Sequence, residues 1–234
     1  ESAIGFVAVF VLVLLRIPIA FAMGFVGMVG LAHETSYRAA ISMVGRLLID
    51  TSQDYGLSVI LLFILMGLFV NKGGISRELY NVSNSFLGHF RGGLAMATIV
   101  ACGGFAAICG SSLATAATMS KVAMPEMRKY GYADSLSTAS IAAGGTLGIL
   151  IPPSVILVIY GLLTETSIGK LFVAGIIPGM LGILLYLVAV RITVARNPDA
   201  GPSGPRATWG ERVHALGQVW AVLLLFGLVI GGLY

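Results

Sequence analysis

Residues 133–168 form an apolar stretch that is too long for one membrane-spanning helix and is interrupted near its middle. As a continuous helix it would be about 54 Å long, whereas the hydrocarbon core of a bilayer is about 30 Å thick. The interruption is Ile151-Pro152-Pro153-Ser154. Because proline lacks a backbone donor and its ring clashes with the preceding turn, we expect two half-helices on either side of Pro152-Pro153.

A second interrupted stretch, residues 92–128, precedes the first one. It contains "GGFAAICGSSLATAATMSK", in which Gly110-Ser111-Ser112 separates an apolar run from one rich in small residues and hydroxyls. Non-helical backbone at membrane depth is tolerated only where it lines a cavity or is buried in protein. No charge lies between Arg91 and Lys121 to anchor a loop outside the membrane. We therefore expect a re-entrant helical hairpin with Gly110-Ser111-Ser112 at its tip.

The composition supports a membrane protein. Hydrophobic residues make up 57% of the chain and charged residues only 10%, whereas a soluble domain has about a quarter charged residues. We therefore expect an all-α polytopic membrane protein that lies in a lipid bilayer. The formal net charge of +4 does not indicate nucleic acid binding, since sparse Lys and Arg between apolar spans are what membrane topology requires.

Other segments complete the chain. Residues 3–32 contain Arg16-Ile17-Pro18 and form either one long tilted span or two short helices hinged at Pro18. Residues 76–89 are amphipathic, with Ser76 as the expected N-cap. No polar flank follows the last apolar run, so we expect a piece of a longer chain. The remaining segments are an interfacial amphipathic helix (37–48), three spans (55–70, 169–194 and 213–234) and a polar connector (196–212).

The basic residues test the hairpin. Lys and Arg favour cytoplasmic loops, and a hairpin that returns to its own side keeps Arg91, Arg128 and Lys129 together with the Arg-rich connector. A single crossing by residues 92–128 would separate these charges and is disfavoured. Two complete crossings would give the same parity as a hairpin, so this alternative stays open.

Two breaks within about 40 residues suggest one shared binding site. Free carbonyls at the ends of half-helices attract Na⁺, and free amides at half-helix N-termini attract anions. The alternative is that the glycines only permit close packing and the prolines only kink a helix. The expected cation-binding residues are Gly110, Ser111, Ser112, Gly148, Leu150 and Pro152. The expected substrate-binding residues are Ser111, Thr115, Pro153 and Ser154.

Two other classes of function compete with transport. An intramembrane enzyme with Ser111 or Ser112 as nucleophile would need a base within hydrogen-bond reach. All three histidines lie at segment ends, and Lys121 lies about 13 Å from Ser112 along the same helix. A structural scaffold subunit would not need two breaks that line a cavity. We therefore expect a transporter and not an enzyme.

Several stretches resemble one transporter family. They are "FLGHFRGGLAMATIVACGGFAAICGSSLATAATMSKVAMPEMRKYGY", "GTLGILIPPSVILVIYG" and "SIGKLFVAGIIPGML". In order and content they resemble the N-terminal half of the large, DctM-like membrane subunit of tripartite ATP-independent periplasmic (TRAP) transporters, from about Ala3 to Tyr234. Many members have Ser-Gly-Ser-Ala at the hairpin tip and an Asp three positions on. Here Cys109, Ser112 and Thr115 stand at the first, fourth and seventh of these positions.

The resemblance implies a function and an architecture. It implies Na⁺-coupled uptake of small organic acids, with a periplasmic substrate-binding protein and a small four-helix membrane subunit as partners, and with no cofactor besides Na⁺. It also implies an elevator mechanism, two inverted repeats of which this chain holds the first, and the inner membrane of a bacterium or archaeon. The implied parts are a scaffold-like region with arm helices (1–90), a transport region with the hairpin and the broken helix (91–168), and a span, connector and start of the second repeat (169–234).

Overall fold

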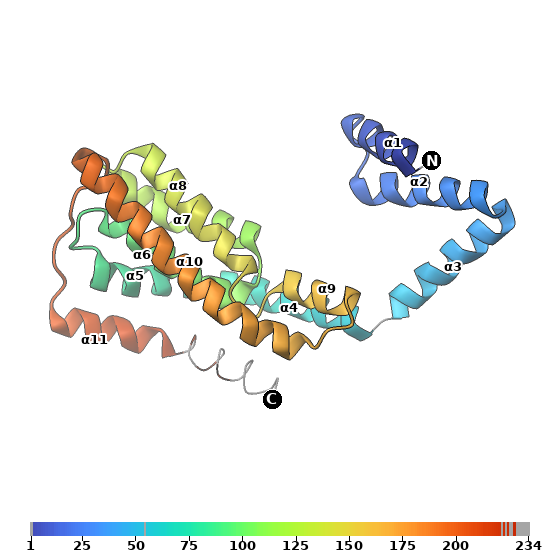
Figure 1. The fold of residues 1–234 in the computed structure, drawn as a ribbon. Coiled ribbons are helices and arrows are strands. Elements are labelled where there is room, and N and C mark those ends of the chain that lie inside the picture. The colour runs from blue at the N-terminus through green and yellow to red at the C-terminus, as the bar shows by residue number, and fades with distance from the viewer. Residues whose placement is uncertain (1, 54, 221, 223, 225–226, 228–234) are drawn as a thin grey trace. The chain divides into compact units, whose positions relative to one another are not determined.

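The computed structural model describes residues 2–53, 55–220, 222, 224 and 227, which form helices joined by short turns (Figure 1). Within these ranges there is no β-strand. This part of the chain is all-α, as the sequence predicts. The chain divides into two compact units, Glu1–Leu57 and Ser58–Tyr234, which are described separately. The scaffold and transport regions expected from the resemblance follow other boundaries and stay a prediction.

The first unit begins with two short helices. Helix α1 (Ser2–Leu14) and helix α2 (Ile19–Glu34) pack against each other, and the chain turns between them at Arg16, which has a φ of 66°. Of the two alternatives for residues 3–32, two helices hinged before Pro18 is therefore correct. Most of their large apolar side chains are exposed, as lipid-facing side chains would be. Helix α3 (Tyr37–Gln53) contains the predicted amphipathic segment and extends beyond it.

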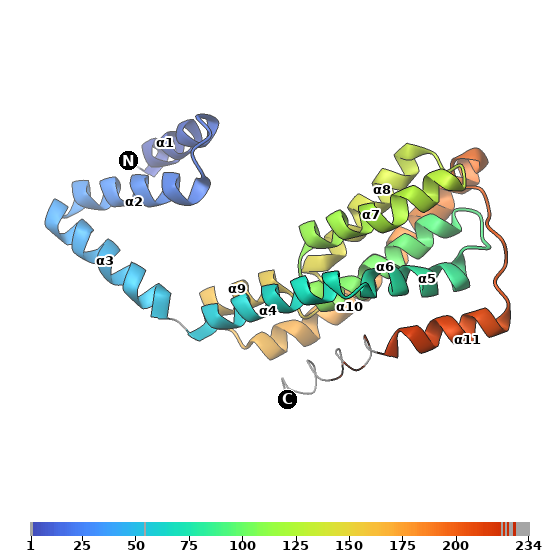
Figure 2. The ribbon, with the colours of Figure 1, turned by 180° about the vertical axis from the view of Figure 1, so that it is seen from behind.

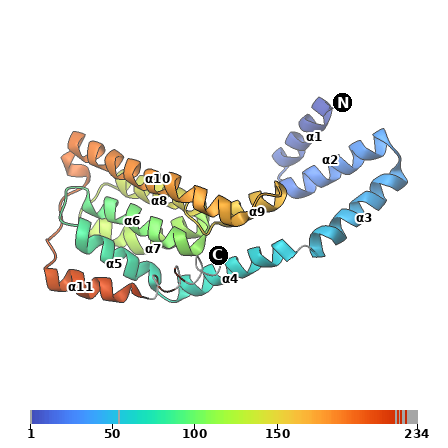
Figure 3. The ribbon, with the colours of Figure 1, turned by 60° about the horizontal axis from the view of Figure 1, so that its bottom comes forward.

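The second unit is a layered helical bundle. Figure 3 shows the long helix α10 on one side and α11 on the other, with α6 to α8 between them. Figure 2 shows α7 and α8 side by side, and both helices also contact α6. The helices are α4 (Tyr55–Lys72, in this unit from Ser58), α5 (Ile75–Leu87), α6 (Gly93–Cys109), α7 (Ser112–Lys129), α8 (Asp134–Thr146), η1 (Leu147–Ile149), α9 (Val155–Leu163), α10 (Ile168–Arg196), η2 (Pro198–Ala200) and α11 (Trp209–Gln218).

Helix α6 forms the centre of this bundle. Its residues are apolar or small on every face, and nearly all of them are buried. A helix that is hydrophobic all round is stable only when other helices or lipid surround it, and here α5, α7, α8 and α10 all contact it. The core side chains include Ile99, Phe105 and Ile108. The central position of α6 fixes the position of the turn that follows it.

Both ends of the α6–α7 hairpin are held together at one end of the bundle. The amide of Gly92 donates to the carbonyl of Gly201 at 2.9 Å, and the amide of Ala133 donates to the carbonyl of Ala200 at 3.0 Å. Arg128 also donates to both carboxylate oxygens of the exposed Asp134, at 2.9 and 3.1 Å. The hydrogen bond from Arg128 lowers the pKa of Asp134. The two helices therefore run antiparallel from a common base.

The structure corrects three predicted boundaries. Helix α5 has Gly74 as its N-cap, so the prediction of Ser76 was wrong. The polar connector ends at Thr208, because Thr208 and Glu211 form a capping box that starts α11. The break in 133–168 begins before the prolines, at the end of α8. Half of the predicted span 213–234 lies outside the described residues.

Length and composition single out one helix as a candidate membrane span among the residues described. It is α10, Ile168–Arg196. The apolar helices Ala3–Leu14, Ile19–Glu34, Ile60–Phe69 and Gly93–Cys109 are shorter. In the pairs α1–α2 and α6–α7, a short turn separates two apolar or small-residue helices.

Candidate functional site

The hairpin tip is a two-residue turn between α6 and α7. Gly110 has a left-handed conformation with φ 62°, which L side chains rarely adopt. Ser111 is extended and forms the N-cap of α7, where its hydroxyl accepts a long 3.4 Å hydrogen bond from the amide of Ala114. The tip therefore ends one helix and starts the next within two residues.

The second break extends from Leu147 to Ser154. The carbonyls of Gly148 and Ile149 would pair with the amides of residues 152 and 153 in a continuous helix, but both are prolines and have no N–H. The hydroxyl of Ser154 donates instead to the carbonyl of Ile149 at 2.9 Å. The same hydroxyl caps α9 by accepting from the amide of Leu157 at 3.4 Å. The carbonyl of Gly148 keeps no donor at the i+4 position.

The two breaks are in direct contact. The amide of Val155, the first residue of α9, donates to the carbonyl of Gly110 at 3.2 Å. A Cβ atom added to Gly110 would lie 2.7 Å from the carbonyl oxygen of Pro153. A Cβ atom added to Gly148 would lie 2.7 Å from the carbonyl carbon and oxygen of Ser111. Glycine at 110 and 148 is thus what lets the backbones approach so closely.

This contact brings together four helix ends of two kinds. Helix α6 and turn η1 end here, at Cys109 and Ile149, and helices α7 and α9 start here, at Ser112 and Val155. Carbonyls at helix C-termini carry partial negative charge, and amides at helix N-termini carry partial positive charge. The arrangement can therefore attract a cation with the first pair and an anionic group with the second.

The other predicted site residues lie around this contact in different ways. Thr115 is fully buried, and its hydroxyl donates to the carbonyl of Ser111 at 2.8 Å. Ser112 starts α7, and its amide nitrogen lies 2.9 Å from the position of a Cβ atom on Gly148. The carbonyl oxygen of Leu150 lies 2.8 Å from the position of a Cβ atom on Gly175, so it faces α10. Pro152 and Pro153 are buried within the break.

Two residues at this contact were not among the predicted ones. Val155 supplies the amide that joins the breaks. Gly175 has no side chain, which lets the carbonyl of Leu150 approach the backbone of α10 closely. The sequence contains a signal for Val155, because the first amides of a half-helix always lack an intrahelical partner. It contains no comparable signal for Gly175, since glycines are frequent throughout this chain.

The described residues include no group of three or more His, Cys, Asp or Glu side chains that could hold a metal ion. The oxygens at the contact of the breaks are those of neutral carbonyls and hydroxyls. Such oxygens suit a hard cation, and they suit a monovalent ion in particular because no buried carboxylate is needed.

Comparison with known proteins assigns the chain to a family. Residues 6–234 match the family model of the tripartite ATP-independent periplasmic transporter, DctM component. The chain belongs to this family. This match confirms the resemblance found in the sequence. The family is that of a membrane transporter component.

Three curated relatives carry names of TRAP transporter large permease proteins. The C4-dicarboxylate protein DctM of Pseudomonas aeruginosa is 42% identical over 80% of this chain and 43% of its own length. The C4-dicarboxylate protein DctM of Vibrio cholerae is 35% identical over 99% of this chain and 51% of its own length. The ectoine protein TeaC of Halomonas elongata is 38% identical over 74% of this chain and 40% of its own length. The chain therefore spans about half the length of the DctM proteins it matches.

Proposed function

We propose that this chain forms one half of the ion and substrate site in a Na⁺-coupled large permease that takes up small organic acids across the inner membrane. Na⁺ lies at the contact of the two breaks, near the hairpin tip and the carbonyl of Gly148. The anionic group of the substrate lies toward the N-termini of α7 and α9. The observation that carries this proposal is the hydrogen bond from Val155 to Gly110, because it joins two breaks far apart in sequence.

The substrate class rests on relatives and on charge. Their names refer to C4-dicarboxylates, ectoine, isethionate and sialic acid, and all four compounds carry an acid group. Two half-helix N-termini favour such a group. The family also supports, as further parts of the proposal, a multi-pass membrane location, a substrate-binding protein and a small membrane subunit. One relative is named as a DctMQ permease, which suggests that two membrane components can form one chain.

The competing classes of function have less support. The relatives are named as transporter permeases, and no such name refers to a reaction catalysed at a serine. Ser111 also has a structural task, since its hydroxyl caps α7. A structural scaffold would not need two helix breaks in contact with each other. Uptake by a complex in which this chain is only a scaffold would also not depend on Na⁺ through Ser111, which the next experiment tests.

Ser111→Ala is expected to raise the Na⁺ concentration for half-maximal uptake by the full-length permease. The change removes one neutral oxygen ligand, worth roughly 0.5–1.5 kcal/mol, which corresponds to about two- to tenfold in affinity. Uptake would be measured in proteoliposomes with the partner subunit and the binding protein. Thr208→Ala serves as a control, because it removes the N-cap of α11 outside the site. An unchanged Na⁺ dependence of the Ser111→Ala permease would refute the cation site.

Arg91→Cys and Lys129→Cys are expected to react with a membrane-impermeant thiol reagent from the same side of the membrane. The reason is that both ends of the hairpin are held at one base by residues 200 and 201. Lys170→Cys should react from the opposite side, and Ser111→Cys only through an aqueous cavity. Cys102 and Cys109 are buried and would be replaced by alanine beforehand. Labelling of positions 91 and 129 from opposite sides would end the re-entrant interpretation.

A further inference from the structure

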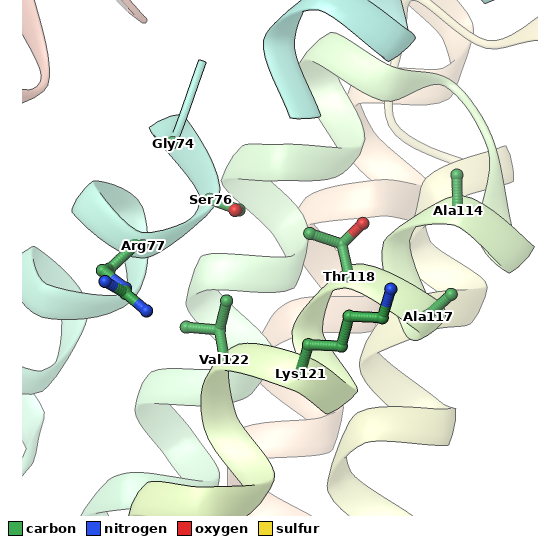
Figure 4. Close-up of a pocket in the computed structure, with 8 residues that line it drawn as sticks. All are labelled: Gly74, Ser76, Arg77, Ala114, Ala117, Thr118, Lys121 and Val122. Atoms are coloured by element: carbon green, nitrogen blue, oxygen red, sulfur yellow. The ribbon is translucent and has the colours of Figure 1, made fainter. Parts of the chain in front are cut away.

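A hollow of about 350 Å³ lies between the start of α5 and the first half of α7, within the second unit (Figure 4). Two positively charged residues line it, Arg77 on α5 and Lys121 on α7. Figure 4 shows Arg77 on α5 and, across Val122, the Lys121 side chain directed toward Ala117 and Thr118 of α7. The hydroxyls of Ser76 and Thr118 line its wall, and Gly74, Ala114, Ala117 and Val122 complete it.

The cations at this hollow have no acidic partner among the residues described. Neither Arg77 nor Lys121 takes part in an ion pair there, since the ion pair found in the described chain joins Arg128 to Asp134. The acidic residues nearest in sequence, Glu78 and Glu126, are not part of the lining. Both side chains are exposed and can therefore contact an anion that enters the hollow.

A buried hydroxyl points into the hollow. Ser76 is only 4% exposed, and its hydroxyl oxygen is directed toward the space between α5 and α7 (Figure 4). It has no hydrogen-bond partner within the described ranges. A hydroxyl in this position can donate a hydrogen bond to an anion in the hollow. Ser76 stands here because Gly74, not Ser76, caps α5.

The start of α5 adds a third contribution. Gly74 is the N-cap and has no side chain with which to accept the first amides of the helix. Helix α5 has 13 residues, so its N-terminus carries the partial positive charge of a full helix dipole. The positive end of the α5 dipole, the Ser76 hydroxyl and the two cations therefore all favour negative charge near the start of α5, where Glu78 is the acidic residue of the first turn.

We infer that this hollow binds an anionic group, a carboxylate or a phosphate, between Arg77 and Lys121. The site differs from the proposed Na⁺ and substrate site, with which it shares no residue. It lies along the arm of α7, and Lys121 is about 15 Å from the tip residue Ser111 by helix rise. The anionic group can belong to a lipid headgroup or to a soluble anion, because both present the same oxygens to Arg, Lys and hydroxyl donors.

The test is thermal unfolding of the purified, delipidated full-length permease at constant ionic strength. The probes are inorganic phosphate and a short-chain phosphatidylglycerol, with a short-chain phosphatidylcholine as the zwitterionic control. We expect at least one anionic probe to raise the melting temperature in a saturable way. Protection by phosphate alone identifies a soluble anion, whereas protection by phosphatidylglycerol alone identifies a lipid headgroup.

Variants locate the effect in the hollow. Arg77→Gln and Lys121→Gln should each weaken the apparent Kd about tenfold, since each removes one charge-assisted contact. Ser76→Ala should weaken it about fivefold. Lys170→Gln removes an exposed cation that lies outside the hollow and should leave the Kd unchanged. Protection that persists in the Arg77→Gln/Lys121→Gln variant, or no protection by any anionic probe, would overturn the inference.

A parallel titration with Na⁺ separates this inference from the proposed function. Stabilisation by Na⁺ that survives in the Arg77→Gln/Lys121→Gln variant shows that the variant is folded and that the tip is intact. If anions protect the wild-type protein but Na⁺ does not, the proposed cation site fails and the anion site stands.

Discussion

Alanine at both Pro152 and Pro153 is expected to lower Na⁺-driven uptake at sub-saturating Na⁺ by about ten- to a hundredfold while membrane insertion continues. Alanine restores amide donors at these positions, and each proline opposes a helix by about 3 kcal/mol relative to alanine. Helix α8 can then extend past Thr146, and the carbonyls of Gly148 and Ile149 enter intrahelical hydrogen bonds. Loss of one or two carbonyl ligands at roughly 1.4 kcal/mol each weakens Na⁺ binding by about ten- to a hundredfold.

The measurement is uptake into proteoliposomes by the full-length double variant with its partner subunit and binding protein. Pro178→Ala is the matched control, because Pro178 lies inside the continuous helix α10 and at no break. It removes a proline from an apolar helix and leaves the residues of both breaks unaltered. Near-normal uptake by the Pro152→Ala/Pro153→Ala permease would mean that the break only kinks a helix.

The proline pair shows how much of the fold could be predicted from sequence. A proline disrupts the hydrogen bond to the residue four positions earlier. The break therefore had to reach back from Pro152 to Gly148, and α8 indeed ends at Thr146. The predicted break at 151–154 located the prolines themselves. It did not include the carbonyls four residues earlier, which lose their amide donors because of the prolines. The same rule, applied four residues upstream of Pro152, would have placed the start of the break at Gly148, two residues after the observed end of α8 at Thr146.

The contact between the breaks could not be calculated from sequence. It depends on how α8 packs against α6 and α7, and no local propensity reports the packing of segments so far apart. The spacing of two breaks only suggested that they were neighbours. The cap of α11 is a different case, because Thr208 followed by Glu211 is a signature that the sequence contained. We placed that boundary four residues too late because the apolar pattern begins only after it.

The Ser76 position illustrates a third kind of limit. Serine is a preferred N-cap, and the sequence prediction followed this preference. The chain instead turns through Gly74 with φ 79°, and this places Ser76 in the first turn of α5 with its hydroxyl facing α7. Only the packing of α5 against the hairpin determines which of the two residues caps the helix, and the same packing forms the hollow.

Gly148→Ala is expected to disrupt the contact of the two breaks as strongly as the loss of the prolines. The new Cβ atom would lie 2.7 Å from the carbonyl carbon of Ser111 and 2.9 Å from the amide nitrogen of Ser112. Both atoms belong to the backbone of the hairpin tip, so relief requires the tip to move away from the break. Overpacking of this kind costs about 1–3 kcal/mol.

A separated tip and break can no longer share one ion. We therefore expect the Na⁺ concentration for half-maximal uptake by the full-length Gly148→Ala permease to rise about tenfold or more. Gly217→Ala is the matched control, since no atom lies within 4 Å of its added Cβ atom and alanine favours the helix there. Equal expression of both variants, compared by size-exclusion chromatography, separates a lost site from a lost fold. An unaltered Na⁺ dependence of the Gly148→Ala permease would show that the tip and the break do not hold the ion between them.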